Sequence, residues 1–125
     1  MKTKGEVEAE VSEAIVRFEI DYMGRGPKEA RSYIIEDMLL VRLKGVLTPA
    51  EQQLTKRTDG VELIKRMRST LIESAKTHLV HVIADITGVK VLDLHTDIST
   101  TSGERVIVFT LESNLEKILT RKKIS

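Results

Sequence analysis

Residues 91–111 read VLDLHTDISTTSGERVIVFTL and indicate the fold more directly than any other part of the chain. Apolar and β-branched residues dominate both ends of this stretch, as is typical of strands, while polar residues gather in its middle. Gly103 can adopt the positive φ that a tight turn requires. The stretch therefore predicts a β-hairpin whose turn spans residues 100–103.

The strands of this hairpin have two different faces, because successive side chains point to opposite sides of a strand. We expect the more apolar face to meet helices; it carries Leu92, Leu94, Thr96, Ile107, Phe109 and Leu111. The opposite face carries Val91, Asp93, His95, Asp97, Val106, Val108 and Thr110. This second face mixes apolar and charged groups.

A second hairpin is predicted by residues 31–44, which are rich in β-formers and alternate in polarity. Its turn is Glu36-Asp37, which lacks the glycine that such turns favour. We expect Leu40, Arg42 and Lys44 to join the mixed outer face.

Helical periodicity marks the rest of the chain, and the predicted helices span residues 6–23, 48–58, 59–87 and 114–119. Thr48 and Glu51 form a capping-box pattern at the start of the second helix, and we expect Asp59 to begin the third in the same way. The third helix has an apolar stripe of Ile64, Met67, Leu71, Ala75, Leu79, Val82, Ile83 and Ile86.

These elements predict an α+β domain of two layers, in which two β-hairpins form an antiparallel four-stranded sheet packed with two long helices and one short helix. A chain of 125 residues suits a single domain over residues 1–125, with a basic C-terminal tail at about 120–125. The net charge of +1 and the sparse aromatic residues disfavour a nucleic-acid-binding module. With no cysteine, no signal peptide and no transmembrane stretch, we expect a cytoplasmic protein, at most peripheral to the inner face of the cell membrane.

The mixed outer face of the sheet allows two interpretations. Its combination of apolar and charged side chains is typical of protein interfaces, which favours a homodimer or a membrane-protein partner. Alternatively, the first helix covers this face within one chain.

The candidate binding residues cluster at the connecting end of the hairpin of residues 91–111. His95 and Asp97 point the same way from one strand, and a carboxylate beside an imidazole can raise its basicity. Glu104 and Arg105 can approach from the facing strand. Arg25, in the sequence Gly24-Arg25-Gly26-Pro27, can donate to an anion. The plainer interpretation is that these polar groups only complete turns.

No nucleophile or second catalytic cluster accompanies these residues, so the sequence predicts no catalytic residue and no cofactor. His78 and His81 lie three apart on the long helix but lack the further ligands that a zinc site needs, so no metal site is predicted either.

Four segments together resemble a family of small bacterial proteins: residues 22–27, 37–51, 87–91 and 95–111. This family is named after the MpsC subunit of a sodium-translocating, membrane-potential-generating system. The resemblance covers about Glu6 to Leu111, supplies no catalytic residue, and departs from the family pattern at Glu36, where we expect glycine. It implies a soluble accessory or regulatory subunit of a membrane-associated ion or inorganic-carbon transport system.

We therefore expect a non-catalytic, self-associating subunit that docks on a membrane protein through a surface around Arg42, His95, Asp97 and Arg105. The alternative is a sensor or enzyme for a small anion that uses His95 and Asp97, with Arg25 or Arg105 closing the pocket.

Overall fold

A computed structural model describes residues 2–124, with side chains placed up to residue 120, so the side chains of the basic tail lie outside the described part. The chain forms α1 (Lys4–Met23), β1 (Glu29–Ile35), β2 (Met38–Lys44), α2 (Pro49–Leu54), α3 (Thr58–Thr87), β3 (Val91–Ser99), β4 (Glu104–Leu111) and α4 (Leu115–Ile124). The predicted α+β class is confirmed, and the final helix is longer than the predicted segment 114–119.

The sheet has the strand order β1-β2-β4-β3, and every neighbouring pair is antiparallel. The two hairpins are thus joined side by side through β2 and β4. Arg42 of β2 lies opposite Val106 of β4, and Val106 lies opposite Asp97 of β3. Residues that are distant in sequence therefore share one row across the sheet.

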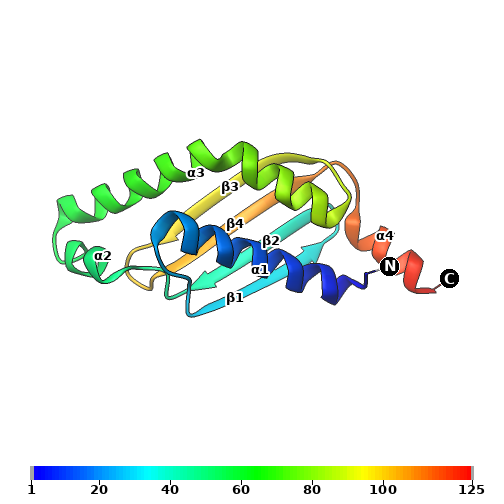
Figure 1. The fold of residues 1–125 in the computed structure, drawn as a ribbon, viewed down its shortest axis with the longest axis horizontal. Helices are drawn as coiled ribbons and strands as arrows, with labels where there is room; N and C mark the ends of the chain where they lie inside the picture. The colour runs from blue at the N-terminus through cyan, green and yellow to red at the C-terminus, as the bar shows by residue number, and fades with distance from the viewer. Residues whose placement is uncertain (1, 125) are drawn as a thin grey trace.

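Both long helices cover the same face of this sheet (Figure 1). The hydroxyls of Ser12 on α1 and Ser32 on β1 lie 2.7 Å apart, and the carboxylate of Glu8 accepts a hydrogen bond of 2.8 Å from the backbone N–H of Ile34. The core lies between the helices and the sheet. Of the two interpretations of the outer face, the one in which the first helix covers it is wrong, and no element of residues 2–124 lies over that face.

The helix starts follow the predicted local chemistry in part. Thr48 and Glu51 form the predicted capping box at the start of α2. The predicted cap at Asp59 is wrong, because α3 begins at Thr58 after Arg57, which makes no side-chain cap. Gly60, in the first turn of α3, packs closely on the end of α2, because a Cβ there would lie 2.0 Å from the carbonyl oxygen of Leu54.

Two residues of β3, Val91 and Leu92, face the opposite way from the prediction. The register shifts between Val91 and Asp93, so Leu92 is 58% exposed and Val91 is buried instead. A bulge inserts one extra residue and reverses the faces before it. The predicted orientation of Asp93, His95 and Asp97 survives because these residues follow the bulge.

The turn between β1 and β2 holds a non-glycine residue in a left-handed conformation. Glu36 has a φ of 55°, in the region where glycine is normally favoured. Its backbone N–H donates to the carboxylate of Glu116 on α4 at 3.0 Å, and its carbonyl oxygen accepts from the backbone N–H of Glu116 at 3.2 Å. Packing against α4 therefore holds this turn.

None of the helices within residues 2–124 carries an apolar stretch sufficient to cross a bilayer.

Candidate functional site

An arginine occupies the middle of the buried stripe of α3. Ile64, Arg68 and Ile72 follow one another at steps of four residues, and all three are buried. Met67, predicted to be in the stripe, is 40% exposed, whereas Arg68 is only 1% exposed. Burying a guanidinium is costly unless it is paired and hydrogen-bonded, so its partners define a site.

Arg68 is hydrogen-bonded on every side. Its Nε and Nη2 donate to the two carboxylate oxygens of Glu51 at 2.8 and 2.9 Å. Its Nη1 donates to Glu19 at 3.2 Å, and Nη2 also donates to the carbonyl oxygen of Val46 at 3.0 Å. The guanidinium thereby joins α3 to α1, to α2 and to the loop after β2.

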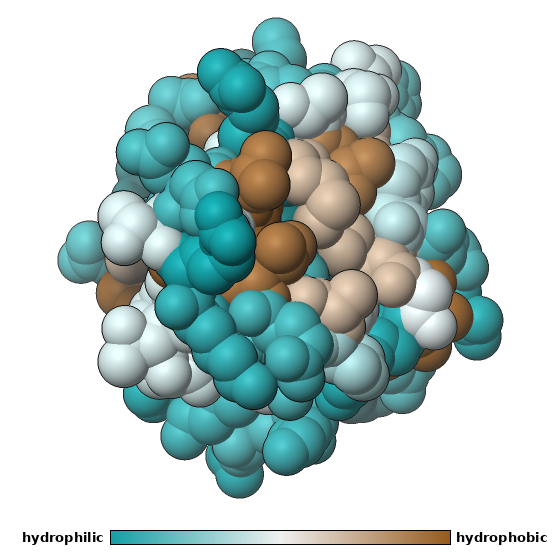
Figure 2. Space-filling view, turned by 90° about the vertical axis from the view of Figure 1, so that its left-hand side faces the viewer, coloured by the Kyte–Doolittle hydropathy of each residue, from teal (hydrophilic) through white to brown (hydrophobic). Residues whose placement is uncertain are grey.

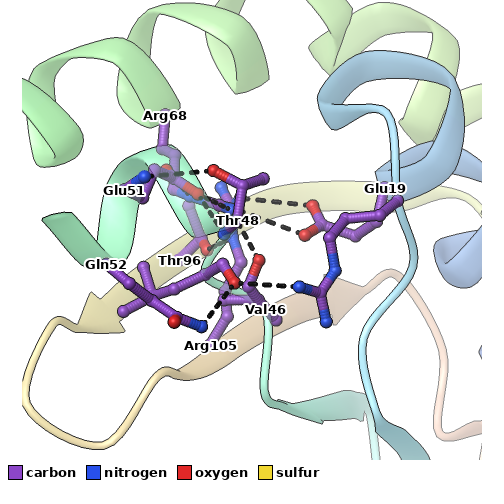
Figure 3. Close-up of polar contacts among 10 residues, drawn as sticks. Glu19, Val46, Thr48, Glu51, Gln52, Arg68, Thr96 and Arg105 are labelled. Carbon is purple, nitrogen blue, oxygen red and sulfur yellow. Dashed lines mark hydrogen bonds and ion pairs between the residues drawn. The ribbon is translucent and has the colours of Figure 1, made fainter.

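A second buried arginine completes the cluster from the sheet. Arg105 of β4 is 3% exposed and donates to Glu19 at 3.4 Å and to the hydroxyl of Thr96 at 3.2 Å. We call Glu19, Glu51, Arg68 and Arg105 the buried ion network. Figure 3 shows these side chains converging from α1, α2, α3 and β4. Two carboxylates balance two guanidinium groups.

The pKa values in the network reflect a contest between burial and pairing. Burial alone would raise the pKa of the Glu51 carboxyl, but hydrogen bonds from Arg68 and from the backbone of Thr48 outweigh it, so that this pKa lies below its usual value. Burial would lower the pKa of Arg68, yet its carboxylate partners raise it overall. Burial lowers the pKa of Arg105, partly opposed by Glu19. The pairing thus keeps Glu51 and Arg68 charged.

The buried ion network is suited to a structural role and not to acting on a substrate. Its side chains are buried, and no buried side-chain nitrogen or oxygen within the described residues lacks a hydrogen-bond partner. Fully satisfied buried polar clusters specify how elements pack, whereas a substrate needs access and free donors. The network therefore fixes the loop between β2 and α2 against the body of the fold.

Arg25, predicted as an anion donor, belongs to the same region. Its Nη1 donates to the carbonyl oxygen of Leu47 at 3.3 Å, and the side chain of Gln52 donates to the same oxygen at 3.3 Å. Arg25 thus secures the loop from its other side, next to the buried ion network.

The other predicted binding residues lie on the opposite side of the sheet. We call this side the open face; its outward residues are Glu29, Arg31, Tyr33, Ile35, Met38, Leu40, Arg42, Lys44, Leu92, Asp93, His95, Asp97, Ser99, Glu104, Val106, Val108 and Thr110. Arg105 faces the helices, so its predicted place on this surface is wrong. Alternation along β4 explains this, because Arg105 follows the outward Glu104 directly.

Pairing on the open face differs from the prediction in detail. Arg42 and Glu104 form an ion pair of 2.7 Å across β2 and β4. His95 approaches Asp93 at 3.3 Å, while Asp97 lies 3.9 Å from Lys65 of α3. The structure thus brings Arg42 and Glu104 together but does not form a paired His95 and Asp97. Among the described residues, no group of three or more acidic or histidine side chains is arranged to hold a metal ion.

Sequence reasoning missed Glu19, Glu51 as an ion-pair partner, and Arg68. A signal was present, because Glu19 continues the buried positions Val11 and Ile15 of α1 at a step of four residues. Arg68 does the same after Ile64 in α3. A charged residue in phase with a buried stripe on each of two helices indicates a buried pair.

A second exposed surface lies at the end of the molecule that contains α2. Figure 2 shows apolar side chains gathered at this end inside a hydrophilic surround. In Figure 1, this end of the molecule holds α2, the first turns of α3 and the last turns of α1. Their exposed apolar residues are Ile20 and Tyr22 of α1 and Leu63 and Met67 of α3. Exposed apolar patches often mark interaction sites.

Comparison with known proteins places these features in a family. The chain is 48% identical over 122 residues to an uncharacterized protein of Bacillus subtilis (strain 168), YbcI, and the match covers 94% of this chain and 98% of that protein. It is 23% identical over 109 residues to another uncharacterized protein of that strain, YrhF, covering 86% and 89% respectively. No solved structure matches significantly. The family model described as the Na+-translocating membrane potential-generating system (MpsC) matches residues 3–113, and the chain belongs to this family.

Proposed function

We propose that the protein acts by binding, as an accessory or regulatory subunit of a membrane-associated ion or inorganic-carbon transport system. The observation that carries this proposal is the open face, a sheet surface that mixes apolar and charged side chains and has no covering element within residues 2–124. Surfaces of this composition are typical of protein interfaces. The family description supports the link to a membrane system.

The arrangement of the polar groups favours binding over catalysis. The buried ion network is closed to substrate and fully hydrogen-bonded. His95 and Asp97 lie on the outward side of β3. Of the two arginines that the anion-sensor alternative offers to close a pocket, the side chain of Arg105 is buried on the helix side of the sheet, and Arg25 donates to the carbonyl oxygen of Leu47. A site for acid–base chemistry needs groups that converge on one reacting atom. The proposed subunit self-associates and works on the cytoplasmic side of the membrane.

Affinity capture from native membranes tests this function. A tagged full chain is used as bait for detergent-solubilised membranes, beside two double variants of equal charge change. Arg31→Glu/Arg42→Glu alters the open face, and Arg17→Glu/Arg66→Glu alters exposed positions on α1 and α3. We expect the wild type and the helix variant to enrich a membrane-spanning transporter subunit, and the open-face variant to lose it. Enrichment of no membrane protein by any bait refutes the proposal.

A further inference from the structure

The open face separates its charges into two halves. The half formed by β1 and β2 carries three cations against one carboxylate, a formal charge of +2, from Arg31, Arg42, Lys44 and Glu29. The half formed by β4 and β3 carries three carboxylates and no outward lysine or arginine, a formal charge of −3, from Glu104, Asp93 and Asp97. The boundary runs between β2 and β4, along the middle of the sheet.

Apolar side chains lie on both sides of this boundary. Tyr33, Leu40 and Val108 occupy one row across three neighbouring strands. Tyr33 is 39% exposed, and Ile35 of the next outward position on β1 is 42% exposed. The surface therefore offers an apolar centre between a basic and an acidic half, which is the composition that specific interfaces use.

We propose that a second copy of this chain occupies the open face, related by a two-fold axis that runs parallel to the strands between β2 and β4. This rotation lays the basic half of each copy over the acidic half of the other. It also sets Leu40 of one copy against Val108 of the second copy. A two-fold interface repeats each contact twice, so both halves are matched at once.

The other two-fold axis that would stack two open faces fits the charge pattern poorly. An axis across the strands lays β3 over β3 and β1 over β1. Asp93 and Asp97 would then face the strand of the second copy that carries the same two carboxylates, and Arg31 would face the basic strand. Like charges brought together at an interface cost several kcal/mol, so the charge pattern selects the axis parallel to the strands.

A hollow on the basic half is positioned to receive a carboxylate. It has a volume of about 150 Å³ and is lined by Glu29, Arg31, Tyr33, Arg42 and Lys44. Arg31 lies in the same row as Asp97, at the opposite edge of the sheet. The proposed rotation exchanges the two edges, and so brings Asp97 of the second copy to this hollow.

Within one chain these charges form ion pairs that stay open to solvent. Arg42 pairs with Glu104 at 2.7 Å across the boundary, and Asp97 lies 3.9 Å from Lys65. Arg31 and Glu29 form an exposed ion pair of 3.1 Å, and exposed pairs contribute at most about 1 kcal/mol. Four strands about 4.8 Å apart and seven residues of about 3.4 Å give a projected area of roughly 450 Å² per copy. This is a small interface, so we expect a dimer that dissociates on dilution and weakens with salt.

This inference rests on the proposed function for the role of the open face as a binding surface. It names a second copy as the occupant in the free protein, which a membrane partner docking on the same face would displace. The end of the molecule shown in Figure 2 lies outside the proposed dimer contact. Self-association is measured on the purified chain without membranes. Failure of the dimer is therefore distinguishable from failure of the membrane docking.

The test is the solution mass of the full chain, measured by sedimentation equilibrium over a range of concentrations at low salt. The monomer has a mass of 14.1 kDa, and we expect the wild type to approach twice that mass as concentration rises. Arg31→Glu/Arg42→Glu makes both halves acidic, and Asp93→Lys/Asp97→Lys removes most of the acidic half. Each variant alone should remain monomeric, and an equimolar mixture should recover a dimer, because each then offers the charge that the other lacks.

The control is Arg17→Glu/Arg66→Glu, which should dimerise like the wild type. Circular dichroism establishes that every variant is folded. A wild type that stays at the monomer mass at hundreds of micromolar overturns the proposal. So does a dimer that persists in both charge-reversed variants, or a mixture of the two that remains monomeric.

Discussion

Replacing Arg68 by methionine tests the energetic reasoning about the buried ion network most directly. The change keeps a long, flexible side chain in the stripe of α3 but removes its charge and all of its donors. Four hydrogen bonds are lost, two to Glu51 and one each to Glu19 and Val46. Glu51 then keeps the backbone N–H of Thr48, at 2.9 Å, as its remaining partner among these groups.

The expected cost follows from the burial of the carboxylates left behind. Arg68, Glu19 and Glu51 have side chains that are at most 3% exposed, so water cannot replace the lost partner. Removing one member of a buried ion pair typically destabilises a protein by about 3–5 kcal/mol. The total stability of a domain is only about 5–15 kcal/mol, so Arg68→Met should remove about a fifth of it or more.

Urea unfolding followed by circular dichroism measures this loss, since the chain has no tryptophan. The control is Arg66→Met on the exposed side of the same helix, which should change stability by no more than about 0.5 kcal/mol. The double variant Glu51→Gln/Arg68→Met should cost less than the sum of the single changes, because it leaves fewer unpaired buried charges.

A loss below about 1 kcal/mol for Arg68→Met would refute the reasoning, since such a value is typical of an exposed pair. Strict additivity in the double variant would contradict the coupling of Glu51 and Arg68. Either result would mean that the interior around α3 admits enough water to solvate the carboxylates.

Three further predictions concern the network and the backbone. Gly60→Ala should destabilise the protein by about 1–3 kcal/mol, because the added Cβ collides with the carbonyl oxygen of Leu54. Gly5→Ala, which has open space around it, should be neutral or slightly stabilising, and the melting temperatures of the two variants measure the difference. Glu36→Gly should raise the free energy of unfolding by about 0.5–1 kcal/mol, because glycine adopts a φ of 55° without strain, and a decrease in chemical denaturation would contradict this. The pKa of Glu51 is lowered in the folded state, so the ionised carboxylate stabilises the protein above the usual pKa of 4.5, and this stabilisation is lost as pH falls through the lower folded pKa. Below pH 4.5, the free energy of unfolding should therefore fall less steeply with decreasing pH in Glu51→Gln than in the wild type, as measured by denaturant unfolding at a series of pH values.

Local rules predicted the elements and several of their boundaries. Alternating side chains and the glycine at position 103 identified the hairpin of residues 91–111, and Gly103 indeed has a φ of 74°. The capping box of Thr48 and Glu51 forms as predicted. These features depend on residues within a few positions of one another, so the sequence alone contains the physical cause.

The candidate site was predictable only where it depends on such local features. Arg42, His95 and Asp97 were placed correctly on one surface, because period-two alternation assigns faces along a regular strand. Leu92 was misassigned because a bulge shifts the register. Arg105 was misassigned although alternation from Ile107 and Phe109 places it on the buried face of β4. The opposite orientation of Arg105 separates it from His95 and Asp97.

By itself the sequence determined the order of the elements, their hairpin turns and the apolar stripes that bury them, since each follows from local propensity and periodicity. Only the tertiary structure decided that both long helices cover one face and that Glu19, Glu51, Arg68 and Arg105 meet in the interior. These outcomes depend on contacts between residues up to 86 positions apart, as in the pair of Glu19 and Arg105. A charge is acceptable in a core only when distant elements bring its partner to it, and that condition is met in space rather than along the chain.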